Sequence, residues 1–249
     1  MSIQIIPTSR IIVLVSLLGV MPFAQAQRDL DEALLVASPD VIAADDELKG
    51  HMESLAREAI DSHCAACHGS DLTGKTGVPN LVDFDWIWGV TGFEMTQAEA
   101  VFEIMQTILY GVRNEDCPDD LKRYGGCPDT RFSQMPGYGE LGFTEAQLNG
   151  LVDWVYSVAG MDHDSAAVEN VANLVPLCSE CHGDDGMGYK AFGGPDLSDR
   201  VWLFGSSREE VYDVIDIGRT ESCPAWSTRL NAATIKALSV FIYNQSMGY

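Results

Sequence analysis

The pentapeptide Cys64-Ala65-Ala66-Cys67-His68 decides the fold, and the chain repeats its pattern as Cys178-Ser179-Glu180-Cys181-His182. C-x-x-C-H is the attachment signature of c-type haem. The two thiols bond to the porphyrin vinyl groups, and the adjacent imidazole becomes the proximal iron ligand. Paired C-x-x-C knuckles also occur in zinc sites, but a histidine directly after the second cysteine in both copies favours haem. The sequence therefore predicts two covalently bound haem c groups, attached through Cys64, Cys67, Cys178 and Cys181, with His68 and His182 as proximal ligands.

The residues that follow the two motifs repeat as well. Counted from the first cysteine of each motif, Pro79 and Trp86 lie at +15 and +22, whereas Pro195 and Trp202 lie at +17 and +24. A single shift of two residues aligns both pairs, which indicates an internal duplication. We expect the prolines to shape the loop under each proximal histidine, and the tryptophans to pack against porphyrin or core.

Helical periodicity fills most of the chain outside these loops. Apolar residues recur every three to four positions in a segment that begins at His51 and runs into the first motif. The other expected helices span residues 97–110, 144–158, 166–177, 207–217 and 231–244. Thr144 is predicted to cap one of them, and Pro176 to bend another. The predicted fold class is all-α: two tandem cytochrome c domains, over residues 51–160 and 161–249, each with one covalently bound haem.

The N-terminus has the composition of an export signal. Arg10 precedes an apolar run from Ile11 to Phe23, and Ala24-Gln25-Ala26 offers a small-x-small cleavage site. The run is short for a membrane span, which needs about 20 apolar residues; an uncleaved anchor is the alternative. We therefore expect a signal peptide over residues 1–26, an acidic N-terminal extension over residues 27–50, and a periplasmic location.

The net charge narrows the choice of partners. Lys and Arg total 15 against 37 Asp and Glu, which gives −22, while 46% of the residues are hydrophobic. This apolar content is that of a soluble globular protein. The negative surface repels nucleic acid and anionic lipid, so we expect redox protein partners with a basic docking surface and no nucleic acid.

A second protein ligand on each iron is typical of an electron carrier. Met135, followed by Pro136, lies between the two last expected helices of the first repeat, where a thioether can reach the distal face of the first haem. A core methionine is the alternative. At the aligned position the second repeat has Cys223, whose thiolate would give the second haem a lower potential. A free thiol beside five-coordinate iron, or ligation by Met187 or Met247, are the alternatives there.

The other cysteines lie in an insertion. The spacing from Gly111 to Pro136 is 25 residues, and that from Gly218 to Pro224 is 6, so the first repeat carries 19 additional residues. Cys117 and Cys127 both fall within this insertion, and in an exported protein they are predicted to form a disulfide. Of the seven cysteines, this leaves only Cys223 without a partner in the chain.

The two halves resemble the di-haem cytochrome c subunit of the cbb-type haem-copper oxidases. The shared stretches are Cys64 to Gly69, Pro79-Asn80-Leu81, Trp86-Ile87-Trp88-Gly89 and Arg131 to Pro136, then Cys178 to Gly183, Pro195-Asp196-Leu197, Trp202 to Gly205, Pro224-Ala225-Trp226 and Ala233 to Lys236. The resemblance implies cytochrome c folds, two covalent haems and electron relay toward or from a larger redox enzyme. By position it assigns His68 and Met135 to the first haem and His182 to the second.

Three features separate the chain from that family. The family's subunit is membrane-anchored, it lacks the insertion, and it has methionine where Cys223 stands. We therefore expect a soluble electron carrier, and not an enzyme, that serves a membrane oxidase or a periplasmic dehydrogenase complex. The alternative is a haem enzyme that oxidises an inorganic sulfur compound, because a His/Cys ligand pair is similar to that of di-haem thiosulfate dehydrogenases. A peroxidase is a third and weaker option.

Overall fold

The computed structural model describes residues 24–83, 85–88, 96–117 and 127–247, and within these ranges the regular structure is helical. Strand-like pairing of the backbone is limited in these ranges to isolated β-bridges. The helices are α2 (Pro39–Ala44), α3 (Asp46–Ala59), α4 (Ala65–His68), α5 (Gln97–Tyr110), α6 (Glu145–Val158), α7 (Ser165–Val171), α8 (Val175–His182), α9 (Arg208–Ile217) and α10 (Ala232–Met247). A π-helical turn, Ile60–Cys64, joins α3 to α4, and a 3-10 turn spans Lys190–Phe192. The all-α prediction is confirmed.

Local sequence signals place most of these helices. The Thr144 hydroxyl accepts from the Gln147 N–H at 3.3 Å, and the Gln147 side chain accepts from the Thr144 N–H at 2.8 Å, so Thr144 caps α6 as predicted. The lead-in to the second motif breaks between α7 and α8, and Pro176 stands in the first turn of α8. This is the bend expected there, because proline has no N–H to continue a helix.

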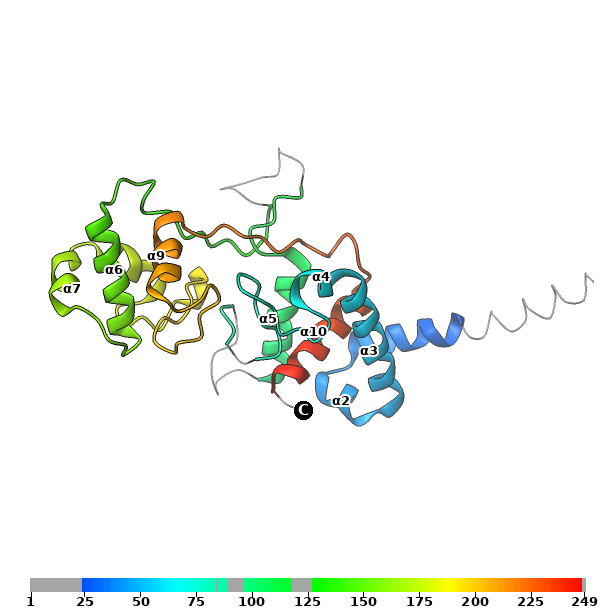
Figure 1. The fold of residues 1–249 in the computed structure, drawn as a ribbon. Helices are drawn as coiled ribbons and strands as arrows, with labels where there is room; N and C mark the ends of the chain where they lie inside the picture. The colour runs from blue at the N-terminus through cyan, green and yellow to red at the C-terminus, as the bar shows by residue number, and fades with distance from the viewer. Residues whose placement is uncertain (1–23, 84, 89–95, 118–126, 248–249) are drawn as a thin grey trace, which may run out of the picture.

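The helices gather into two units, each with its own apolar core (Figure 1). The first-motif unit contains α2 to α5 together with α10, and the second-motif unit contains α6 to α9. Helix α10, from the end of the chain, packs against α3 and α5, whereas α6 packs against α7 and α9. The last helix of each repeat therefore belongs to the core of the other repeat. This differs from the expected boundary after residue 160, which assigned α6 to the first domain and α10 to the second.

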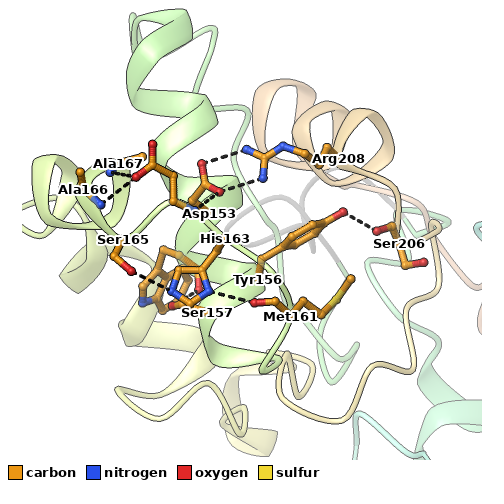
Figure 2. Close-up of polar contacts among 12 residues, drawn as sticks. Asp153, Tyr156, Ser157, Met161, His163, Ser165, Ala166, Ala167, Ser206 and Arg208 are labelled. Carbon is orange, nitrogen blue, oxygen red and sulfur yellow. Dashed lines mark hydrogen bonds and ion pairs between the residues drawn. The ribbon is translucent and has the colours of Figure 1, made fainter.

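An ion pair links α6, from the first repeat, to α9, from the second. Asp153 on α6 is 4% exposed, and its two carboxylate oxygens accept from both terminal nitrogens of Arg208 on α9, each at 2.8 Å (Figure 2). The same carboxylate accepts from the Asp164 N–H at 3.0 Å, next to the start of α7. Hydrogen bonds from Arg208 lower the pKa of Asp153. Tyr156, one turn further along α6, donates to the Ser206 carbonyl at 2.7 Å.

The acidic N-terminal extension expected over residues 27–50 is a structured part of the first-motif unit. Residues 24–36 are helical, and Leu34 is fully buried in the first-motif core together with Ile42 of α2. His51 Nε2 on α3 lies 2.7 Å from an Asp31 carboxylate oxygen. A few well-spaced apolar residues thus bury this stretch despite its charge. Residues 1–23, which hold most of the predicted signal peptide, lie outside the described residues.

Two extended segments carry the chain from one unit to the other, before α6 and after α9 (Figure 1). Each segment passes close to a glycine at the end of one of two equivalent helices. Gly111 follows α5 at φ +72°, and Gly218 follows α9 at φ +77°. A Cβ at Gly111 would lie 2.3 Å from the Cys223 carbonyl oxygen, and one at Gly218 would lie 2.4 Å from the Met135 carbonyl oxygen. Each crossing segment therefore passes directly over the helix end of the other repeat.

Gly111→Ala is expected to lower the free energy of unfolding by about 3 kcal/mol or more. The substitution combines a backbone conformation that only glycine adopts readily with a collision against the Cys223 segment. Gly50→Ala is the matched control, because Gly50 lies exposed in α3 with nothing within 4 Å of an added Cβ. That control should gain about 0.5–1 kcal/mol from helix propensity. Urea titrations of the two variants check both values; equal stabilities would contradict the crossing geometry.

Candidate haem sites

The two proximal histidines are held in the same way. His68 ends α4 and His182 ends α8. Their Nδ1 atoms lie 2.9 and 3.0 Å from the backbone carbonyl oxygens of Pro79 and Pro195. A carbonyl only accepts, so Nδ1 carries the proton and Nε2 keeps its lone pair for iron. Burial lowers the pKa of both imidazoles, which favours the neutral form that binds a metal.

The loop under each histidine closes on itself through matching hydrogen bonds. The Gly74 N–H donates to the His68 carbonyl at 2.9 Å, and the Gly188 N–H donates to the His182 carbonyl at 2.7 Å. Gly74 adopts φ +70°, and a Cβ there would lie 2.3 Å from the Val78 carbonyl oxygen. The tight turn brings the proline carbonyl onto the imidazole, which explains the spacing of motif and proline in both repeats.

The predicted tryptophans lie in different cores. Trp86 packs against the first-motif core and donates from Nε1 to the Asp83 carbonyl at 3.0 Å. Trp202 packs against the second-motif core together with Cys178, and its buried Nε1 has no hydrogen-bond partner in the described part of the chain. A buried donor without a partner costs free energy, so the Trp202 site fits an acceptor supplied by a bound group.

Two arginines missed by the sequence analysis complete the fit to haem. Arg131 and Arg219 precede Met135 and Cys223 by the same four residues, and this equal offset is the signal that could have found them. The Nε atom of each is buried without a partner among the described residues. Haem carries propionate carboxylates, and an arginine N–H is the donor that suits a carboxylate. The side chains present therefore fit a haem in each unit: thiols and imidazole for attachment, and free donors for the carboxylates.

The structure brings Cys223 to the first motif and Met135 to the second. Cys223 is partly buried, and burial, followed by the nearby Cys64 and Cys67, raises the pKa of its thiol to about 11. Met135 is partly buried against the second-motif core. Of the alternative ligands for the second haem, Met187 is 61% exposed and Met247 lies on α10.

The two repeats also meet through their proximal loops. Trp88 of the first loop lies against Gly193 of the second, where an added Cβ would be 2.2 Å from the indole. In the reciprocal contact, Phe204 packs on Gly77, whose N–H donates to the Leu203 carbonyl at 2.9 Å. Arg131 covers the Trp88 ring and Arg219 covers the Phe204 ring, with guanidinium carbons 5.3 and 4.3 Å from the centroids. The two sites therefore share one pseudo-symmetric contact.

Cys117 and Cys127 of the insertion are joined by a disulfide in the structure, with Cα atoms 5.8 Å apart. The Cys127 N–H donates to the Asn114 carbonyl at 2.8 Å, so the bridge closes the loop near the segment that follows α5. Residues 118–126 inside this loop lie outside the described residues.

Asp85 predicts a pH-dependent stability where the proximal loops meet. Burial, followed by repulsion from Asp199, Asp83 and Asp196, raises its pKa to about 6. A raised carboxyl pKa contributes stability that is complete below about pH 4 and is lost as the pH rises through about 6. Asp85→Asn should therefore raise the free energy of unfolding by on the order of 1 kcal/mol at pH 7.5, discounted for partial exposure.

The test of this prediction is a pair of unfolding curves at pH 4 and pH 7.5. At pH 4 the variant and the parent protein should differ little, because both carry a neutral group at this position. Asp162→Asn, at an exposed site, is the control and should show no such pH-dependent difference. A variant with the same advantage at both pH values would contradict the assignment to Asp85.

The comparisons with known proteins agree with this geometry. A profile of the family described as cytochrome c oxidase, cbb3-type, subunit III matches residues 168–242. The cbb3-type cytochrome c oxidase subunit CcoP of Cereibacter sphaeroides is 31% identical over 228 residues, which cover 91% of this chain and 72% of that protein. The subunit FixP of Bradyrhizobium sp. is 33% identical, over 87% of this chain and 69% of its own length. The chain belongs to the CcoP/FixP family. The chain carries two covalently bound haem c groups, so the alternative of a zinc site at the two C-x-x-C motifs is excluded.

Family membership also corrects the predicted location. The family's subunits are membrane-anchored parts of an oxidase, so the expectation of a soluble periplasmic protein released by a cleaved signal peptide is wrong. Within the described residues, none of the helices has both the length and the apolar character that a membrane crossing requires.

Proposed function

We propose that this CcoP/FixP family member is an electron-transfer subunit of a cbb3-type oxidase, which relays electrons between a donor protein and the catalytic part of the complex. The observation that carries the proposal is the pair of matching histidine sites, each with a thioether or thiol segment beside it. When bound, haem c supplies one-electron chemistry between ferric and ferrous iron. The chain itself holds the imidazoles, supplies buried donors and brings the two sites together. Catalysis belongs to another subunit.

The charge of the chain supports a basic donor. A net charge of −22 attracts a cationic protein over a distance that salt shortens. We expect the rate of reduction by a basic cytochrome c to fall steeply as ionic strength rises. The relatives named above support this electron-transfer role, and not the oxidation of an inorganic sulfur compound.

The experiment is purification of the affinity-tagged chain from its own membranes in mild detergent. We expect it to co-elute with a haem-copper oxidase, and both haems to be reoxidised when oxygen is admitted to the reduced complex. A Cys178→Ser/Cys181→Ser variant, which lacks one attachment site, should co-elute but lose the relay. Haems that stay reduced under oxygen while the oxidase turns over with another donor would overturn the proposal.

A further inference from the structure

The loop after the second attachment motif exposes three large apolar side chains. Met187, Tyr189 and Phe192 are 61%, 49% and 57% exposed. The rings of Tyr189 and Phe192 meet edge-on, with centroids 6.4 Å apart. Exposed apolar side chains that gather in this way mark protein interaction sites, and methionine and aromatic residues are the types enriched there. We refer to these three residues as the loop patch.

Backbone hydrogen bonds hold the loop patch against the second attachment motif. The Tyr189 N–H donates to the Cys181 carbonyl at 2.8 Å, and the Gly188 N–H donates to the His182 carbonyl at 2.7 Å. The far end of the loop closes on the motif too, because a Cβ at Gly194 would lie 1.9 Å from the Cys181 carbonyl oxygen. A protein seated on the loop patch therefore lies one hydrogen bond from the residues that hold the second haem.

The equivalent loop after the first motif is polar, although its backbone follows the same path. In each loop the glycine six residues after the proximal histidine donates to the carbonyl of that histidine, which fixes the register between the repeats. At the two exposed positions that flank this glycine the first loop has Thr73 and Lys75, whereas the second has Met187 and Tyr189. The turn forms with either pair, so the fold does not require the apolar one. Contact with another protein explains it.

Carboxylates border the loop patch. Glu180, Asp184 and Asp185 are all exposed on the motif and on the first turn of the loop, and Asp185 accepts from the Met187 N–H at 3.1 Å. A cation of the same loop, Lys190, is half-buried, and nearby carboxylates offset its charge. An apolar centre with a negative border suits a partner whose own contact region is apolar and bordered by lysine and arginine.

We propose that the loop patch and its acidic border form the docking surface for a cationic electron-donor protein, so that electrons enter the chain at the haem attached at Cys178 and Cys181. The inference rests on the proposed function and adds the place of entry to it. In each encounter one electron leaves the donor, which is oxidised, and reduces ferric iron at this motif. The first haem then receives its electrons from the second haem and not from the donor.

Stopped-flow mixing of the oxidised holoprotein complex with a reduced basic cytochrome c tests the acidic border. Asp184→Lys should lower the second-order rate constant for haem reduction about fivefold or more at an ionic strength of about 0.01 M. At about 1 M salt, which screens the charges, the variant should match the parent complex. Glu58→Lys, at an exposed position of α3, changes the net charge equally and should have less than about half this effect. Equal effects of the two variants would overturn the proposal.

The apolar centre has its own test, because contacts between apolar side chains are not screened by salt. Met187→Thr/Tyr189→Thr should lower the same rate constant about tenfold at high as well as low ionic strength. Reduction by a small uncharged reductant should keep the parent rate, which verifies an intact haem site. A parent rate with cytochrome c would overturn the proposal. Loss of co-elution with the oxidase would overturn it as well, by assigning the loop patch to the catalytic part of the complex.

The outcomes separate the docking surface from the relay. Unchanged rates in the loop variants, while oxygen still reoxidises both haems of the reduced complex, would reject the docking surface and leave the relay in place. Haems that stay reduced under oxygen, while the loop variants slow reduction by cytochrome c as expected, would reject the relay to the oxidase and leave the docking surface in place.

Discussion

Leu238→Ala is expected to destabilise the first-motif unit by about 2–5 kcal/mol, although Leu238 belongs to the second repeat. The side chain is 1% exposed on α10, in the core that α10 forms with α3 and α5. Truncation leaves a cavity in this shared core. Hydrogen exchange of the holoprotein should show faster exchange in α3 and α5, with α7 and α9 changed little.

Leu151→Ala is the matched control for this effect. Leu151 is also 1% exposed, but it lies on α6 in the core of the second-motif unit. Its truncation should cost a similar free energy and accelerate exchange in α7 and α9 instead. If each variant loosened the helices of its own repeat, the exchange of α6 and α10 would be contradicted.

Cys223→Met is expected to raise the reduction potential of the haem attached at Cys64 and Cys67 by on the order of 100 mV or more. Axial ligands set haem potentials over a range of about 0.8 V, and with Cys223 as the expected ligand the variant replaces a thiolate with a thioether. The thiolate resonance signal should disappear at the same time. The potential of the other haem should change much less, because the segment that lies against the second-motif core carries Met135 and not Cys223.

A spectroelectrochemical titration measures both potentials. The control is Cys117→Ser/Cys127→Ser, which removes the disulfide cysteines and should leave both values near those of the parent protein. An unchanged pair of potentials in Cys223→Met would show that Cys223 does not bind iron. A rise confined to the haem attached at Cys178 and Cys181 would show that the ligand pairing follows chain order.

Local features of the fold could be predicted from the sequence, and long-range packing could not. Thr144 and Pro176 act on neighbouring residues, so their effects on α6 and α8 could be predicted directly. The partners of α6 and α10 could not, because duplicated repeats carry equivalent apolar faces, and the helix of one repeat fits the core of the other. The choice depends on the path of the two crossing segments, which pair over a long sequence separation.

The sites divide in the same way. The attachment cysteines and proximal histidines form a contiguous motif. The contact of the Pro79 carbonyl with His68 could be anticipated too, because only a short loop separates the two residues. Arg131 and Arg219 were given no role, although the repeats were aligned on Met135 and Cys223, because only the structure shows that their Nε atoms are buried without a partner among the described residues. The buried Leu34 was missed because acidic residues surround it.

The position of α10, after every helix of the second-motif unit, has a consequence for biogenesis. Every helix of the second-motif unit, and Met135 with it, is synthesised by residue 217. The core of the first-motif unit is incomplete until residues 232–247 have been synthesised, because α10 is part of it. The core beside the first attachment cysteines is therefore completed after the core beside the second, although the first cysteines are synthesised earlier. A nonsense mutation shortly after residue 230 would leave the second-motif core complete and would remove α10 from the first-motif core.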